Sequence, residues 1–154
     1  MVVGSFLACG QRFVGKAFAP RFSVKPVPLG TYGTWQGIPG PHQTAEALGN
    51  PGVKVIGSPA LLALIEGCSN TTLQPFYEAE EAAVGIRFAL DHCSAAVVGE
   101  PLQVQVKVVE VTGRRVQFKV EILQQGRLVM HGSYTCQVVD LPRFLARYGL
   151  KAGD

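Results

Sequence analysis

The chain has 154 residues, enough for one domain with a sizeable hydrophobic core. Apolar residues make up 47% of the chain and charged residues only 16%, which excludes an intrinsically disordered or coiled-coil protein. The formal net charge of +3 is weak and scattered. It therefore does not indicate a nucleic-acid partner, although it suits an anionic small ligand. No apolar run is long enough to predict a membrane span.

The N-terminal segment does not have the order of a secretory signal, because apolar residues precede its first positive charge. Basic residues but no acidic ones occur before Glu46, which is compatible with a mitochondrial presequence. The four cysteines show no metal-binding spacing and suit a reducing compartment. We therefore expect a cytoplasmic protein, or a mitochondrial one if the source is eukaryotic, without a metal site.

The first part of the chain predicts little regular structure. Phe18, Phe22 and Val24 alternate with other residues but Pro20 interrupts them, so residues 14–25 predict an irregular or edge strand. Residues 27–43 are rich in glycine and proline and predict a loop, which contains the only tryptophan, Trp35. Such a loop is either a lid over a site or a surface insertion. We expect residues 1–13 to be an N-terminal extension and residues 14–150 to form a single domain.

The segment SPALLALIEGC, residues 58–68, predicts a helix that ends before Pro75. Ser58 offers a capping oxygen and Pro59 a preset first helical residue. The apolar residues that follow cover most of the helix circumference, so we expect burial on most sides. Upstream, residues 44–50 predict a short helical turn closed by Gly49.

Apolar and polar residues alternate with a period of two in four segments after this helix, at residues 84–91, 102–108, 116–122 and 128–134. This period with one polar face is typical of antiparallel strands packed on one side. The turn signals Thr112-Gly113 and Gln125-Gly126 predict a meander of hairpins. Residues 141–150 predict a short terminal helix. One apolar helix against one antiparallel sheet is an α+β arrangement, and a curved sheet wrapped around one central helix is the hotdog fold.

Two titratable residues interrupt the apolar pattern, Glu66 in the helix and His92 on a strand. If the strand is regular, His92 continues the alternate series from Val84 and points toward the helix. The carboxylate and the imidazole would then meet at the helix–sheet boundary, where such a pair can supply a base near neutral pH. The simpler interpretations are a glutamate at the solvent edge of the helix, a histidine that is hydrogen-bonded in the core or lies at a strand end, and Ser58 as a cap alone.

Four stretches of the chain resemble the fluoroacetyl-CoA thioesterase-like family of hotdog proteins. These stretches are VGKAFAPRFSVKP, IGSPALLALIE, VGIRFALDHCSAAVVGEPLQVQVKVVEVTGRRVQFKVE and GSYTCQVVDLPRF, which cover most of the chain from Val14 to Phe144. In that family a Thr-Pro or similar pair begins the helix, a Glu follows eight residues after the Thr, and a His lies in the next strand, seven residues after a Gly. The matching residues here are Ser58, Glu66, His92 and Gly85. The chain departs from the family at residues 133–136, SYTC, where relatives often carry Thr-His-Glu-Arg.

The resemblance implies a hydrolase that cleaves a small or medium acyl-CoA thioester. Glu66 would be the nucleophile or general base, His92 its acid–base partner, and Ser58 the residue that polarises or positions the thioester. The backbone of Gly85 would help to bind the carbonyl group. Trp35 is a candidate substrate contact on its own account, because the Gly/Pro-rich insertion around it does not match the lid of the fluoroacetyl-CoA enzyme, whose fluorine selectivity is therefore not carried over. No cofactor is implied, because coenzyme A is part of the substrate.

Coenzyme A carries phosphates, and the basic residues of the strands and hairpin are candidate contacts for them. We single out Arg114 and Arg115, with Arg87, Lys107 and Lys119 as further candidates; the simpler interpretation is a solvated strand face or turn. An alternative function is a non-catalytic hotdog protein that binds an acyl-CoA or a small apolar ligand, and a hotdog dehydratase or hydratase is a third.

Helix geometry adds one constraint on the site. Eight residues of α-helix rise about 12 Å, so the side chains of Ser58 and Glu66 cannot touch on one regular helix. Either the two residues flank a ligand, or Ser58 lies on a loop that curls back, or the site combines two subunits. Similar hotdog proteins are dimers with sites at the subunit boundary, and a dimer also covers an open sheet edge. We therefore expect a homodimer with a shared site, with neither nucleic acid nor membrane as a partner.

Overall fold

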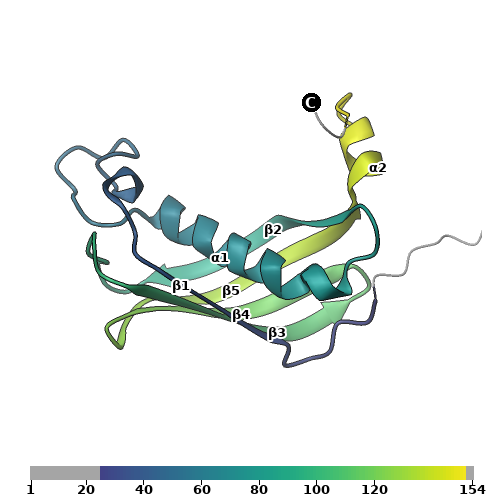
Figure 1. The fold of residues 1–154 in the computed structure, drawn as a ribbon, viewed down its shortest axis with the longest axis horizontal. Coiled ribbons are helices and arrows are strands. Elements are labelled where there is room, and N and C mark those ends of the chain that lie inside the picture. The colour runs from purple at the N-terminus through teal and green to yellow at the C-terminus, as the bar shows by residue number, and fades with distance from the viewer. Residues whose placement is uncertain (1–24, 152–154) are drawn as a thin grey trace, which may run out of the picture.

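The computed structural model describes residues 25–151. Five strands and one long helix form its body, and a short helix follows the last strand (Figure 1). The elements are β1 (Tyr32–Gly37), α1 (Ser58–Leu73), β2 (Glu81–His92), β3 (Leu102–Thr112), β4 (Arg115–Gln124), β5 (Arg127–Asp140) and α2 (Leu141–Ala146). The expected extension 1–13 and, apart from its last residue, the expected strand 14–25 lie outside the described residues.

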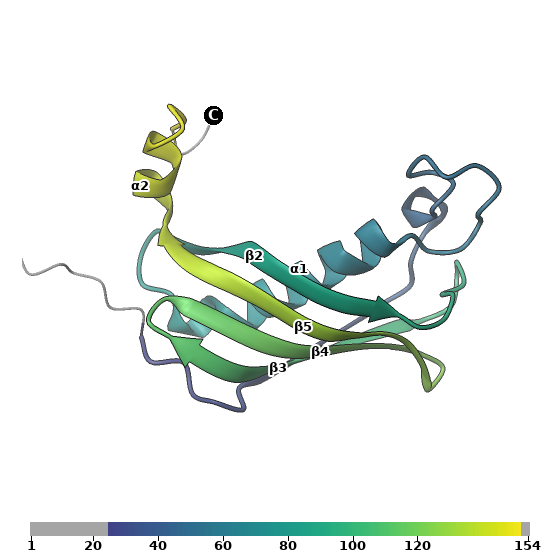
Figure 2. The same ribbon diagram turned by 180° about the vertical axis from the view of Figure 1, so that it is seen from behind.

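The five strands form one antiparallel sheet in the order β1-β3-β4-β5-β2. Helix α1 lies across one face of this curved sheet, and Figure 2 shows that no helix of the described part covers the other face. The expected hotdog fold is thus confirmed. The meander holds for β3, β4 and β5, but the expectation that β2 belongs to it is wrong, because β2 pairs with β5 instead of β3. No helix in the described part has the length and apolar character needed to cross a bilayer.

The segment expected to be an irregular loop contains a strand. Residues 32–37 pair with β3 from Tyr32 opposite Lys107 to Gly37 opposite Leu102. Trp35 lies opposite Val104, whose side chain is fully buried, and its half-buried ring packs against the core. Trp35 is therefore part of the sheet, which excludes the interpretation of this segment as a lid.

Helix α1 buries one face. Leu61, Ile65, Cys68 and Leu73 are at most 4% exposed, at a spacing that places them on one side of an α-helix. The opposite side, including Ala63 and Gly67, is exposed. The expected burial on most sides is therefore wrong for the described chain. The helix ends before Pro75 as expected, and the predicted turns at residues 112–113 and 125–126 and the terminal helix are confirmed.

The ladder between β2 and β5 depends on a glycine. Gly132 lies opposite Leu90 with a φ of 144°, in a region that side chains rarely adopt. A Cβ atom at this position would overlap the carbonyl oxygen of Ala89, which belongs to the backbone of the paired strand. The close approach of β2 to β5 at this point therefore requires a glycine.

We predict that Gly132→Ala lowers the free energy of unfolding by about 3 kcal/mol, because backbone strain and overlap with β2 add together. Gly126→Ala is the matched control, since its φ of 76° is also positive but an added Cβ would meet nothing within 4 Å. This control should cost about 1 kcal/mol. Urea unfolding of both variants measures the difference, and equal losses would contradict the role of the close approach.

Candidate active site at the boundary of helix α1 and strand β2

Ser58 and His92 meet where α1 begins and β2 ends. The Ser58 Oγ lies 2.8 Å from His92 Nδ1, and both residues are exposed. Ser58 is the first residue of α1, whereas the N-cap is Gly57, with no side-chain hydrogen bond to the helix end. The interpretation of Ser58 as a cap alone is therefore wrong. Depending on the imidazole tautomer, the hydroxyl donates a hydrogen bond to the ring nitrogen or accepts one from its N–H.

Glu66 lies two turns further along α1 and is half-buried. Its Oε1 is 3.5 Å from the hydroxyl of Tyr134, a long hydrogen bond. A Cβ atom at Gly85 would overlap the same carboxylate oxygen and would lie 3.2 Å from the Tyr134 ring. The absence of a side chain at residue 85 is therefore what leaves room for the carboxylate between α1 and β2.

The regular alternation expected for β2 is wrong, because the strand contains a bulge between Gly85 and Arg87. The bulge reverses which residues face the helix. Gly85 faces Glu66 before the bulge, whereas Phe88 and His92 face the helix side after it. After the bulge the alternation is regular from Phe88 to His92, so His92 still points toward α1 as expected.

Tyr134 is a candidate site residue to which the sequence analysis gives no role. It is 2% exposed, and its ring centroid lies 5.2 Å from that of Phe88 and 6.2 Å from that of Phe118. Burial raises the pKa of the Tyr134 hydroxyl well above its usual value, and the neighbouring Cys136 and Glu66 raise it further. The hydroxyl therefore stays protonated and donates toward Glu66. Its place in the alternating series 128–134 already predicts that it faces the helix, but not that it reaches a carboxylate.

An open groove of about 270 Å³ adjoins the carboxylate, lined by Glu66, Gly67, Asn70, Ala83 and Tyr134. The Ser58–His92 pair is not part of its lining. Gly85 and His92 are seven residues apart on β2, which corresponds to roughly 20 Å of strand. Within one chain, the carboxylate and the Ser58–His92 pair are thus two separate parts of the site.

None of the other predicted substrate contacts lines the groove beside Glu66. Trp35 is on β1, at the opposite edge of the sheet from β2. The Arg114 Nη2 lies 2.7 Å from Glu81 Oε1. Arg115 is exposed and lines a groove on the outer face of the sheet together with Arg87. The assignment of these residues as substrate contacts stays a prediction.

The described residues contain no group of three or more His, Cys, Asp or Glu side chains that could hold a metal ion. The side chains at this boundary offer a carboxylate, an imidazole and two hydroxyl groups. A carboxylate beside an open groove, with an imidazole and a hydroxyl to share protons, is suited to general-base or nucleophilic attack on a carbonyl group.

Comparison with known proteins agrees with this fold. The solved structure of the fluoroacetyl-CoA thioesterase FlK has a TM-score of 0.76 and 21% identity to this chain, and the match covers 81% of this chain and 97% of FlK. The protein TTHA0967 of Thermus thermophilus, a thioesterase superfamily member, has a TM-score of 0.75 and 22% identity over 81% of this chain and 93% of its own. A hot-dog-like protein from Thermanaerovibrio acidaminovorans has a TM-score of 0.73 and 20% identity over 79% of this chain and 90% of its own.

No curated protein sequence matches this chain significantly. The model of one family, described as FlK, fluoroacetyl-CoA-specific thioesterase, matches residues 40–141. This match spans α1, β2 to β5 and the boundary at which Ser58, Glu66 and His92 lie. The chain belongs to the fluoroacetyl-CoA-specific thioesterase family.

Proposed function

We propose that this chain is an acyl-CoA thioesterase that hydrolyses a small or medium acyl group. The observation that carries the proposal is the Glu66 carboxylate held over Gly85 beside an open groove, in a chain of a thioesterase family. The proposal concerns acyl-CoA thioesters in general and assigns no preference for fluoroacetyl-CoA.

In the proposed reaction, Glu66 either attacks the thioester carbonyl directly or removes a proton from the attacking water. The Ser58 hydroxyl and the Gly85 backbone stabilise the oxygen on which negative charge develops. As the C–S bond breaks, His92 donates a proton to the leaving thiolate, giving free coenzyme A. In the direct route the attack forms an acyl anhydride with Glu66, which water then cleaves, whereas in the general-base route that water is itself the nucleophile. In both routes water supplies the hydroxyl of the carboxylic acid, and its other proton replaces the one that His92 gave up. Tyr134 positions the Glu66 carboxylate through its hydroxyl.

We further propose that the site is shared by two copies of the chain. Among the described residues, β2 pairs only with β5, so its other edge is open. Ile86 and Phe88 on this strand are 47% and 42% exposed, which is the kind of edge that pairs with another strand. A two-fold axis between Phe88 and Ala89 would join two β2 strands in antiparallel fashion. It would place Gly85 opposite the partner subunit's His92 and so bring Glu66 toward the Ser58–His92 pair of the other copy.

The proposed compartment is the cytoplasm, or the mitochondrion if the source is eukaryotic. The cysteines of the described part, Cys68, Cys93 and Cys136, are free thiols, which supports a reducing environment.

We predict that the full-length chain releases coenzyme A from at least one thioester in a panel of acetyl-, butyryl-, hexanoyl- and benzoyl-CoA, measured by thiol detection. Glu66→Gln and His92→Ala should each lower kcat/KM about 100-fold or more, because each removes a proton-transfer group. Unfolding curves show whether each variant keeps the wild-type fold. Tight acyl-CoA binding without hydrolysis would instead support the non-catalytic alternative, and full turnover in both folded variants would refute the site.

We predict that Gly85→Ala lowers kcat about 100-fold, because the added methyl group displaces the Glu66 carboxylate by the order of an ångström. Ala79→Ser is the matched control, since it adds one atom at an exposed residue that precedes β2 and lies outside the proposed subunit contact. It should retain wild-type turnover. Activity in Gly85→Ala equal to that of the control would show that the position of the carboxylate is not set by residue 85.

We predict that Glu66→Gln and His92→Ala chains complement one another when they are co-expressed with different tags and purified as mixed dimers. Each mixed dimer contains one site with both native residues and one with neither, so it should recover about half of the wild-type activity per dimer. Light scattering should give twice the 16.5 kDa chain mass. A dimer that recovers no activity would show that each site lies within one chain.

A further inference from the structure

A second groove, of about 310 Å³, lies at the end of the sheet between β5 and α2. Its lining includes three arginines, Arg114, Arg143 and Arg147, together with Asp140, the ring of Phe144 and strand residues 137–139. We call it the arginine groove. No step of the proposed hydrolysis uses it.

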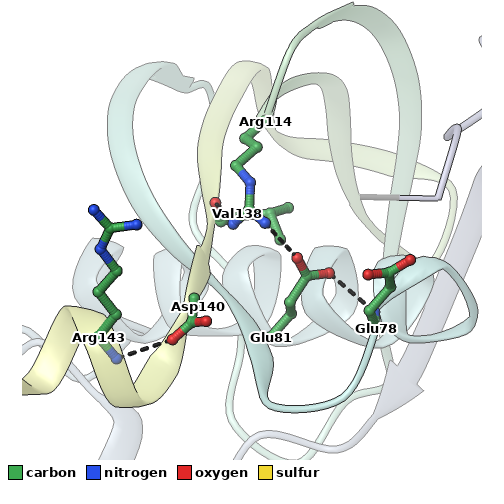
Figure 3. Close-up of polar contacts among 6 residues, drawn as sticks. All are labelled: Glu78, Glu81, Arg114, Val138, Asp140 and Arg143. Carbon is green, nitrogen blue, oxygen red and sulfur yellow. Dashed lines mark hydrogen bonds and ion pairs between the residues drawn. The ribbon is translucent and has the colours of Figure 1, made fainter. Parts of the chain in front are cut away.

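Arg114 forms a fixed wall of this groove. It extends from the β3–β4 hairpin to Val138 of β5, as Figure 3 shows, and its Nη2 donates to Glu81 Oε1 at 2.7 Å. Its Nη1 donates to the carbonyl oxygen of Val138 at 3.4 Å. The Glu81 side chain is only 5% exposed, and its other oxygen accepts from the backbone N–H of Glu78 at 2.9 Å. The guanidinium is thus held in place before any ligand arrives.

The other two arginines come from α2 and its C-cap. Arg143 and Arg147 are four residues apart, so they lie on the same side of the helix. Between them in the sequence is Phe144, whose ring packs edge-on against Tyr148 at a centroid distance of 5.3 Å. The Oδ1 of Asp140 accepts from the backbone N–H of Arg143 at 2.9 Å and so caps the helix (Figure 3).

The arginine groove has the chemistry of a site for a phosphorylated nucleotide. Three arginines against two carboxylates, Glu81 and Asp140, leave it positively charged. Guanidinium groups bind phosphate oxygens in a bidentate manner, and an aromatic ring offers a surface for a base to stack on.

We propose that the arginine groove binds the 3′-phosphoadenosine diphosphate end of acyl-CoA, an inference that rests on the proposed thioesterase function. The two grooves are neighbours on the sheet. Ala83 lines the groove of Glu66, and Glu81, which holds Arg114, is two residues earlier on β2, or about 7 Å. On β5, Tyr134 and Val138 line the two grooves and are four residues, about 13 Å, apart. The pantetheine arm of coenzyme A separates the thioester from the phosphates by a chain of comparable length.

Arg87 and Arg115 form the competing basic site. They line a groove of about 380 Å³ with Glu110, on the outer face of the sheet and without an aromatic ring in the lining. The Glu66 carboxylate lies on the helix side, so a substrate bound to the outer groove would have to pass around the β2 edge. The arginine groove is the shorter path, and the two sites are distinguishable by mutation.

The direct test is calorimetric titration of the full-length chain with adenosine 3′,5′-bisphosphate, a probe that lacks the pantetheine arm and the thioester. The wild-type chain should bind it with one site per chain. Arg143→Gln and Arg147→Gln should each weaken the affinity about tenfold, because each removes a charge-assisted hydrogen bond. Lys54→Gln removes an exposed charge outside both grooves and should bind like the wild type. No binding by the wild type, or a loss in the double variant Arg87→Gln/Arg115→Gln with none in the α2 variants, overturns the proposal.

A kinetic test separates this proposal from the proposed function. With acetyl-CoA or whichever acyl-CoA is hydrolysed, Arg143→Gln should raise KM about tenfold and leave kcat unchanged. With the corresponding acyl-pantetheine, which has no nucleotide, the same variant should match the wild type in both constants. If the enzyme hydrolyses acyl-CoA but the variant keeps its KM, the groove assignment is wrong and the hydrolase stands. If no thioester is hydrolysed, the function is wrong and the titration alone decides the groove.

Discussion

The packing of one face of α1 against the sheet is the constraint on which the rest of the structure depends. Leu61, Ile65 and Leu73 have no exposed surface, and burial of each such side chain contributes roughly 1.5–3 kcal/mol. This fixes the rotation of the helix about its axis. Glu66 follows Ile65, and one residue turns an α-helix by about 100°, so the carboxylate lies at the margin of the buried face. The position of the candidate catalytic group is therefore a consequence of core packing.

Two glycines on the strands allow the sheet to approach this helix from both sides. Gly33 on β1 lies against Thr72, and Gly85 on β2 lies against Glu66; a Cβ atom at either position would overlap the helix side chain. The physical role is the same at both edges, since each glycine permits close packing where a larger residue would push α1 away. Only at β2 does the space accommodate a group that can perform chemistry. Close packing of α1 against a strand glycine thus occurs twice, once at a structural contact and once at the candidate site.

Much of this architecture is predictable from the sequence for identifiable reasons. A period of two in apolar residues depends only on which face of a strand is packed, so this pattern locates β2 to β5. The hairpins are located by the turn glycines at residues 113 and 126, both of which adopt positive φ. The pattern does not say which strands are neighbours, because parity is the same whether β2 pairs with β3 or β5. Strand β1 is not predicted, because its glycines lower the intrinsic propensity of the segment to form a strand. In the structure, pairing with β3 outweighs this low propensity.

The candidate site is likewise predictable from the sequence only in part. The spacing of Ser58, Glu66, Gly85 and His92, read through the family resemblance, locates residues that the fold brings to one boundary. The bulge after Gly85 has no signal in the alternation, since one extra residue changes parity without changing composition. The contact between Tyr134 and Glu66 is equally absent from any local pattern, because it joins residues 68 positions apart.

Strand β2 connects the proposed chemistry to assembly. It carries Gly85 under the carboxylate near one end and His92 at the other, and its outer edge is open in the described chain. In the proposed dimer, a two-fold axis through the middle of the antiparallel strand pair would exchange the ends, so each carboxylate would face the imidazole of the other copy. Because the exposed Ile86 and Phe88 lie on the same strand, the surface whose burial would favour association in the proposed dimer would also determine the distance between the proposed reacting groups. Assembly and formation of the site are then a single structural event, which gives a physical reason for an apolar edge strand that an isolated chain would be expected to avoid.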